Sequence, residues 1–287
     1  MLSGMSSLRC CFVILFFISC SLLCPAITNA QADEESRSWN QPVKPFRIVG
    51  NVYYVGATDI TSYLITTPKG HFLLDGGFEE TAPMIRANIE KLGFKVSDVQ
   101  YILSSHAHYD HAGGIAELKR ITHAKFVSSE GDRAQHARGG KDDPNFGDRF
   151  LYPPIIADRI IKDSESITLG GVTMTAHITA GHTPGCTTWT TKADGHDVIF
   201  VGSPTIPNGY KLVGNEKYPT IANDYRRQFR TLRSIHPDVF LASHGNFFDL
   251  QAKIASRNFV DPDGYRKFVE EMEARFEKVL AEQERLR

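Results

Sequence analysis

The segment Ser-His-Ala-His-Tyr-Asp-His-Ala-Gly-Gly, residues 105–114, holds a dense group of possible metal ligands. His106 and His108 are two residues apart, so in an extended backbone both side chains point the same way and can reach one ion. Asp110 and His111 follow where the chain must turn, and their side chains can reach a second position nearby. Four candidate ligands within six residues, mixing imidazole and carboxylate, favour zinc or another borderline divalent cation.

Two further histidines stand in a similar context. His182, in Gly-His-Thr-Pro-Gly, follows a strand-like segment at 172–177, and His244, in Ser-His-Gly-Asn, follows one at 239–241. Both come just past the carboxyl end of a predicted strand, where the sites of sheet proteins gather. Glycines on both sides of His182 would let the backbone approach an ion closely.

The candidate ligands now number five histidines and one aspartate. A catalytic zinc site has three protein ligands and an open position for water, so the set divides evenly into two such sites. This division favours catalysis. The alternative is that all six side chains form a closed structural site.

The composition is that of a folded globular protein. Of the 287 residues, 41% are hydrophobic and 23% charged, and the formal net charge is -1. No basic field is therefore available to bind nucleic acid or anionic lipid. The sequence contains no G-x-G, G-x-S-x-G or S-x-x-K spacing, which excludes dinucleotide-binding folds, kinases and the common serine hydrolases. We expect a small-molecule partner and no nucleic acid.

The first thirty residues have the pattern of a secretory signal peptide. Arg9 precedes the apolar run at 11–23, and small residues ending at Ala30 are followed by a polar stretch. A membrane anchor is the alternative, but the run is shorter than the roughly 20 apolar residues that span a bilayer. We expect cleavage after Ala30, a periplasmic protein with no membrane attachment, and a mature chain whose single cysteine, Cys186, forms no internal disulfide.

The elements that must position the ligands follow a polar, proline-containing segment at 31–46, which we expect to be an extended arm. Runs rich in β-branched and aromatic residues predict strands at 51–55, 62–66, 71–75, 99–103, 124–127, 166–169, 172–177, 187–191, 198–201 and 239–241. Helical spacing of apolar residues predicts helices at 83–92, from about 114, at 223–234 and after Pro262. Two strand-rich halves with flanking helices predict an α/β fold, a layered helix–sheet–sheet–helix sandwich in one domain at 47–287.

With these motifs the sequence resembles the metallo-β-lactamase superfamily, whose signature is H-x-H-x-D-H. More narrowly, it resembles the subclass B3 metallo-β-lactamases along nearly the whole mature chain, in stretches at 38–42, 74–77, 105–113, 152–154, 180–185 and 209–212. The resemblance implies the four-layer αβ/βα sandwich and two zinc ions per chain. It also implies which residues bind them: the first zinc by His106, His108 and His182, the second by Asp110, His111 and His244.

The activity that the resemblance implies is hydrolysis of the amide bond of β-lactam antibiotics by metal-bound hydroxide, which would confer antibiotic resistance. Asp110 would also be catalytic, because it would orient the nucleophile by a hydrogen bond. Ser203 and Thr205 would hold the substrate carboxylate. Trp39 would cover the bound drug, or else pack in the core. We expect a monomer.

The residue that follows a late strand distinguishes the possible activities within this superfamily. Superfamily members that hydrolyse lactones, thioesters or phosphodiesters usually carry an aspartate that bridges both metals after a late strand. Here the strand at 198–201 ends in Gly202-Ser203-Pro204, and serine is no strong zinc ligand at neutral pH. A zinc-storage or adaptor protein is the non-enzymatic alternative, and it leaves two open three-ligand sites without a reason. Cys186 stands where relatives often have serine, and we assign it no role.

Overall fold

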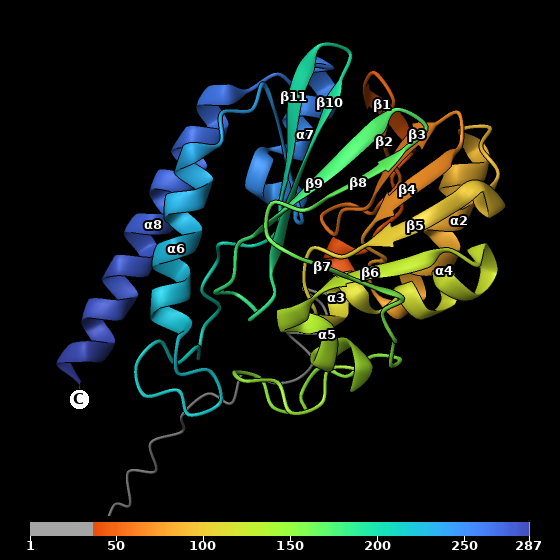
Figure 1. The fold of residues 1–287 in the computed structure, drawn as a ribbon. Coiled ribbons are helices and arrows are strands. Elements are labelled where there is room, and N and C mark those ends of the chain that lie inside the picture. Colours follow the sequence, from red (N-terminus) through yellow and green to blue (C-terminus); the bar gives the residue numbers. More distant parts are fainter. Residues whose placement is uncertain (1–36, 287) are drawn as a thin grey trace, which may run out of the picture.

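Two β-sheets pack face to face, and helices cover the outer side of each, in the computed structural model of this protein (Figure 1). The structure describes residues 37–286, so the predicted signal peptide at 1–30 and the first part of the predicted arm lie outside the described residues. The α/β sandwich of four layers that the sequence predicts is confirmed.

The first sheet has the strand order β1-β2-β3-β4-β5-β6-β7. Its strands are β1 (Phe46–Val49), β2 (Val52–Tyr54), β3 (Tyr63–Thr67), β4 (Gly70–Leu74), β5 (Val99–Leu103), β6 (Lys125–Ser129) and β7 (Arg159–Ile161). Strands β1 to β4 pair antiparallel, whereas β4 to β7 pair parallel. Parallel neighbours need crossover connections, which are supplied by α2 (Ala82–Lys91), α3 (Tyr109–Ala112), α4 (Ile115–Thr122) and α5 (Glu130–Ala137).

The second sheet has the order β12-β11-β10-β9-β8. Its strands are β8 (Ser166–Leu169), β9 (Val172–Ile178), β10 (Thr187–Ala193), β11 (His196–Val201) and β12 (Val239–Ala242). The remaining helices are α6 (Ile221–Ser234), α7 (Leu250–Ser256) and α8 (Pro262–Arg285), with short 3₁₀ turns η1 (Glu79–Thr81), η2 (Val96–Asp98) and η3 (Gly245–Phe248). Within residues 37–286, no helix is both long and apolar enough to span a membrane.

Alternation along the strands divides the apolar side chains between two cores. In β3, Tyr63 and Ile65 face the second sheet, whereas Leu64 faces the helices, because successive side chains of a strand point to opposite faces. On that outer face, Ile85 of α2 and Leu118 of α4 complete a separate cluster. The strands between the helices and the second sheet are therefore buried on both faces.

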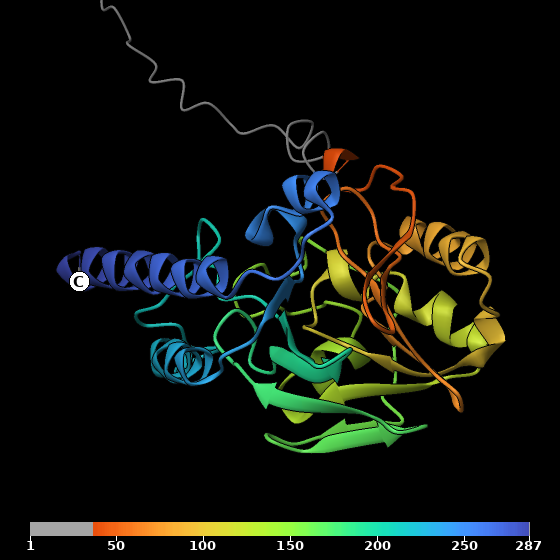
Figure 2. The ribbon, with the colours of Figure 1, turned by 90° about the horizontal axis from the view of Figure 1, so that it is seen from above.

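The other helical layer consists of α6 and α8, which lie side by side on the far side of the sheets from α2 and α4 (Figures 1 and 2). The ring of Phe276 in α8 packs on Tyr225 and Phe229 of α6, with ring centroids 5.3 Å and 5.7 Å apart. The apolar stripe predicted for α8 is confirmed, since Phe268, Phe276 and their neighbours on that face are buried. This packing joins α8 to α6 beside the second sheet.

Strands β1 and β7 and helices α5 and α7 were not predicted, and each has a local reason. β1 begins inside the segment assigned to the arm, and β7 has only three residues. In α5 the buried positions are polar, namely Asp132, Gln135 and His136, so no apolar stripe marks the helix. In α7 the buried residues are Leu250 and Lys253. A helix whose inner face is polar gives little hydrophobic periodicity.

Asp132, in the first turn of α5, holds two loops together. Its Oδ2 accepts hydrogen bonds from the Ala107 N–H (3.0 Å) and the Thr183 hydroxyl (2.7 Å), and its Oδ1 accepts one from the Gly185 N–H (2.7 Å). The side chain is 1% exposed, so these donors have no water to replace it. Asp132 thereby fixes the loop after β5 relative to the loop after β9.

We expect Asp132→Ala to lower the free energy of unfolding by about 3 kcal/mol, because three buried donors would lose their acceptor. Urea denaturation measures the loss. The matched control is Glu130→Ala in the same helix turn, since Glu130 is exposed and pairs with Arg133 at the surface. It should cost less than about 1 kcal/mol, and equal losses in the two variants would contradict the role of Asp132.

We expect the contribution of Asp132 to the stability of the protein to depend on pH. Burial raises the pKa of Asp132 from 3.8 to about 6, although hydrogen bonds from Thr183 and Gly185 oppose the rise. The folded state then holds the proton more tightly than the unfolded chain, so the contribution of Asp132 to stability increases as pH falls through 6 toward 4. Asp132→Asn cannot titrate. We therefore expect the stability of the wild type relative to this variant to rise on acidification, as measured by urea unfolding at several pH values. A difference that does not change with pH would contradict the prediction.

Candidate metal centre

The backbone between β5 and α3 is held in place by several other parts of the fold. The Ser105 N–H donates to Asp75 Oδ1 (2.7 Å), and the Ser105 carbonyl accepts from the Thr187 N–H (2.7 Å). The Ser104 carbonyl accepts from the indole N–H of Trp189 (3.0 Å). Asp75, just after β4, and two residues of β10 thus hold the segment on both sides, and these hydrogen bonds position the side chains that follow it.

The first three predicted ligands meet in one buried place. His106, His108 and His182 each offer a ring nitrogen, and these nitrogens lie within 4.8 Å of one another. The three rings are 4.7–4.9 Å apart between centroids. His106 and His108 follow β5, whereas His182 follows β9 of the other sheet, as the sequence predicts.

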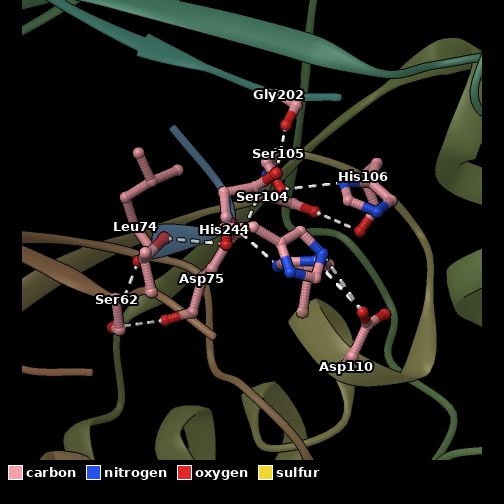
Figure 3. Close-up of polar contacts among 12 residues, drawn as sticks. Ser62, Leu74, Asp75, Ser104, Ser105, His106, Asp110, Gly202 and His244 are labelled. Carbon is pink, nitrogen blue, oxygen red and sulfur yellow. Dashed lines mark hydrogen bonds and ion pairs between the residues drawn. The ribbon is translucent and has the colours of Figure 1, made fainter. Parts of the chain in front are cut away.

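The other three predicted ligands meet beside them. Asp110 Oδ2 lies 3.3 Å from His111 Nε2 and 3.5 Å from His244 Nε2, and the two nitrogens are 3.2 Å apart (Figure 3). His106 also lies within 4.8 Å of Asp110 and His111 at its ligand atom. The two triplets are therefore contiguous, and the two buried His/Asp clusters are consistent with one dimetal site.

Each of the five histidines has a polar neighbour at one ring nitrogen, which leaves its other nitrogen for a metal. The neighbours are Ser105 Oγ, 3.0 Å from His106 Nδ1; Asp143 Oδ2, 3.6 Å from His108 Nε2; Asp75 Oδ2, 3.6 Å from His111 Nδ1; Thr205 O, 2.9 Å from His182 Nδ1; and Asp59 Oδ2, 2.8 Å from His244 Nδ1 (Figure 3 draws the first). Histidines that bind metals typically have such a partner, which orients the ring. This arrangement fits the metal-binding interpretation of all five.

The carboxylates among these neighbours were not predicted as site residues. Asp75 belongs to the Leu-Asp-Gly-Gly stretch and has a left-handed backbone with φ of 62°, which is unusual for a residue other than glycine. That feature turns its carboxylate toward Ser105 and His111. Asp59 and Asp143 lie in loops with no motif, so no sequence signal identifies them.

Burial and neighbouring charges set the protonation of the two triplets. Burial, with the adjacent histidines, holds the pKa of His106 and of His182 well below the usual range, so both rings are neutral and their lone pairs are available. Burial alone would raise the pKa of Asp110, but His111 and His244 lower it well below its ordinary value. Burial likewise opposes the charge on His111, and Asp110 outweighs it and raises that pKa to about 10. The second triplet therefore has an ionised carboxylate to offer a cation.

The predicted substrate-binding residues lie around this centre. The Trp39 ring packs edge-on against His244, with centroids 5.6 Å apart. Thr205 is half-buried, and Ser203, only 1% exposed, lies behind it with its Oγ 3.0 Å from Thr205 Oγ1. Trp39 and Thr205 are thus at the site. The part of all three in substrate binding stays a prediction.

Two aromatic residues of other loops complete the surroundings. Phe146 lies 5.2 Å from the His108 ring, and Tyr210 stacks on His182 at 5.7 Å between centroids. The two rings also contact each other at 5.3 Å. Phe146 lies in the loop before β7, and Tyr210 in the loop before α6. Only tertiary contacts bring them to the metal centre.

The glycines beside His182 are required for a reason other than the predicted approach to an ion. Gly181 has φ of +148°, and a Cβ there would lie 2.8 Å from the ring of Tyr225. A Cβ at Gly185 would lie 2.3 Å from the backbone nitrogen of Asp132. Both positions need glycine because other parts of the protein pack against them.

Cys186 does not belong to either triplet of the described residues. It is fully buried, its Sγ accepts a hydrogen bond from the Ser203 N–H (3.2 Å), and burial raises the pKa of its thiol. A buried neutral thiol is unreactive.

The family model and the solved structures that match this chain indicate the same family. Residues 55–244 match the metallo-beta-lactamase superfamily. Among solved structures, a metallo-β-lactamase of Cronobacter sakazakii described by its HARLDQ motif is 44% identical, with a TM-score of 0.85 over 87% of this chain and 99% of that one. FEZ-1 from Legionella gormanii is 42% identical, with a TM-score of 0.83 over 85% and 98%. BJP-1 of Bradyrhizobium japonicum, a subclass B3 enzyme, is 36% identical, with a TM-score of 0.82 over 87% and 98%.

Matches to curated proteins are shorter. A hydroxyacylglutathione hydrolase of Rhodopseudomonas palustris (strain HaA2) is 32% identical over 126 residues, which cover 44% of this chain and 41% of that protein. This chain spans about half the length of the curated relatives that it matches. The solved structures, in contrast, are matched over nearly their whole length, and the fold agrees with them. The chain belongs to the metallo-β-lactamase superfamily and, within it, to the subclass B3 metallo-β-lactamases.

Proposed function

We propose that this protein hydrolyses the amide bond of β-lactam antibiotics with two zinc ions and so confers resistance. The observation that carries the proposal is the pair of contiguous, buried ligand triplets in a chain 44% identical to a metallo-β-lactamase. One zinc would be held by His106, His108 and His182, and the other by Asp110, His111 and His244. This assignment is supported by the short distances within each triplet.

Zinc held by three protein ligands keeps an open position, makes water nucleophilic near neutral pH and polarises a carbonyl. Asp110 has two tasks in the proposed reaction. Its low pKa keeps the carboxylate ionised, so it binds a cation and accepts a hydrogen bond from water. That bond directs the oxygen lone pair of the water at the lactam carbonyl. His106 and His182 remain neutral, and protons do not compete for their lone pairs.

Substrate positioning falls to the residues around the triplets. The hydroxyl of Thr205 lies 3.4 Å from His182 Nδ1 and would donate a hydrogen bond to the substrate carboxylate. Ser203 Oγ, 3.0 Å behind it, would orient that hydroxyl. Trp39 covers the outer side of His244 and would exclude water from the bound β-lactam.

A thioester or lactone hydrolase is the second candidate, because the curated relatives include a hydroxyacylglutathione hydrolase and an N-acyl homoserine lactonase. The position after β11 weighs against it. Ser203 occupies that position and is turned toward Thr205, so this position supplies no carboxylate to bridge two metals. The β-lactam substrate therefore remains the better proposal.

We also propose that the protein acts as a monomer in the periplasm, exported by the segment at 1–30. The apolar run after Arg9 and the small residues before the polar stretch support export. The near-neutral net charge and the lack of a basic stretch fit a small-molecule partner.

We expect the purified protein to open the ring of a chromogenic cephalosporin much faster than it cleaves a glutathione thioester, as followed by absorbance. Dialysis against a chelator should abolish the activity, and added zinc should restore it, because a bound cation is what makes water nucleophilic near neutral pH and polarises the carbonyl. Inhibitors that acylate serine should have no effect. A preference for the thioester, or activity that survives complete metal removal, would refute the proposal.

We expect Asp110→Asn to lower kcat by about 100-fold or more, because a neutral amide binds zinc poorly and orients water poorly. Steady-state kinetics and metal analysis on the same sample provide the test. Asp263→Asn is the control, since Asp263 is exposed and pairs only with Arg266 within its helix. It should leave turnover unchanged. Full turnover of Asp110→Asn with both metals bound would rule out the assigned role.

A further inference from the structure

The last turns of α8 hold the loop that precedes α6. Gln283 Oε1 accepts hydrogen bonds from the N–H groups of Leu212 (2.8 Å) and Val213 (3.2 Å). Its Nε2 donates to the carbonyl of Tyr210 (2.7 Å). One side chain therefore supplies hydrogen-bond partners for three backbone groups of an irregular loop. In a helix or a sheet, such groups would bond to other backbone groups.

That loop reaches the metal centre through Tyr210. The Tyr210 ring, 2% exposed, stacks on His182 with an interplanar angle of 29°, and its hydroxyl donates to the His182 carbonyl at 3.1 Å. Its other neighbour is Phe146, which contacts His108. The position of Tyr210 is therefore linked to the proposed ligands of the first zinc.

On its other side the loop contacts the segment that contains Phe146. Asn215 Nδ2 donates to Asn145 Oδ1 (3.1 Å), and Lys217 forms an ion pair with Asp142. Between the two loops lies a cavity of about 400 Å³, lined in part by Asn145, Lys211 and Asn215. The shape of this cavity depends on where the loop at 207–217 is held.

The helix that carries the anchor packs on α6. Phe276, two turns before Gln283 in α8, packs on α6 and is fully buried. Arg275 adds a contact of its guanidinium with the Ile206 carbonyl at 3.4 Å, just before the same loop. Gln283 thus joins a helix packed on α6 to a loop without regular structure.

We propose that Gln283 is a positioning residue for substrate binding. It holds the loop at 207–217 so that Tyr210 stays stacked on His182 and the loop keeps its shape beside the metal centre. The inference rests on the proposed function. A loop that must be ordered when substrate binds costs binding free energy, so loss of the anchor raises KM. The loop does not carry Asp110, so kcat is largely spared.

The test compares Gln283→Met, which keeps the length and removes the hydrogen bonds, with Gln283→Glu, which keeps the acceptor for two N–H groups. The matched control is Glu282→Met, at the exposed neighbouring position. We expect Gln283→Met to raise KM about 5- to 10-fold with kcat within about 2-fold. Metal content should be unchanged, Gln283→Glu should be intermediate, and the control should match the wild type. A parallel fall of kcat and metal content would overturn the proposal.

Hydrogen exchange supplies a readout that does not depend on activity. The amides of Leu212 and Val213 should exchange at least about 10-fold faster in Gln283→Met than in the wild type or Glu282→Met. Unchanged exchange, or faster exchange with unchanged KM, would overturn the proposal. If the wild type opened no β-lactam ring, the proposed function would fail, and exchange alone would then support or overturn the anchoring of the loop.

Discussion

Five imidazole rings and a carboxylate share one buried space, and most of the structure around them follows from what such burial requires. Polar groups removed from water are destabilising unless each has a partner. Here His106 and His182 are neutral, Asp110 is paired with His111, and each ring has a polar neighbour at one nitrogen. The ring nitrogens and the carboxylate oxygen that face one another within the two triplets carry lone pairs, which a dication can bind in place of protons. Burying these polar groups together is therefore destabilising without a metal, and metal binding would offset that cost.

Because the cluster is unfavourable by itself, its backbone must be held from outside. The two sheets bring the ends of β5, β9 and β12 to the same edge, and Asp75 and Asp132 then join neighbouring loops by hydrogen bonds from buried N–H groups. Both carboxylates are almost fully buried, so their bonds do not exchange with water. Geometry at the ligands therefore depends on residues that never face a substrate.

The sequence could predict the residues that lie close together in the chain, but not those that only the packed fold brings together. His106, His108, Asp110 and His111 lie within six residues, so strand periodicity and one turn suffice to group them. His182 could be added because it follows a predicted strand. Asp59 bonds His244 across 185 positions, and the polar inner face of α5 gives no hydrophobic period. No local sequence pattern predicts such contacts, because only the packing of the two sheets brings these residues together.

The metal ligands and the loops beside them are held in place by different parts of the fold. Four of the six proposed ligands come from one short motif after β5, whereas Thr205 and Tyr210, which lie beside the centre, come from a loop of the second half. That loop is held by long-range contacts with α6 and α8, such as those of Gln283 and Tyr225, whose hydroxyl donates to the Thr205 carbonyl. Substitutions in these helices can therefore shift the substrate range while the motif after β5, held by Asp75, Thr187 and Trp189, keeps its geometry.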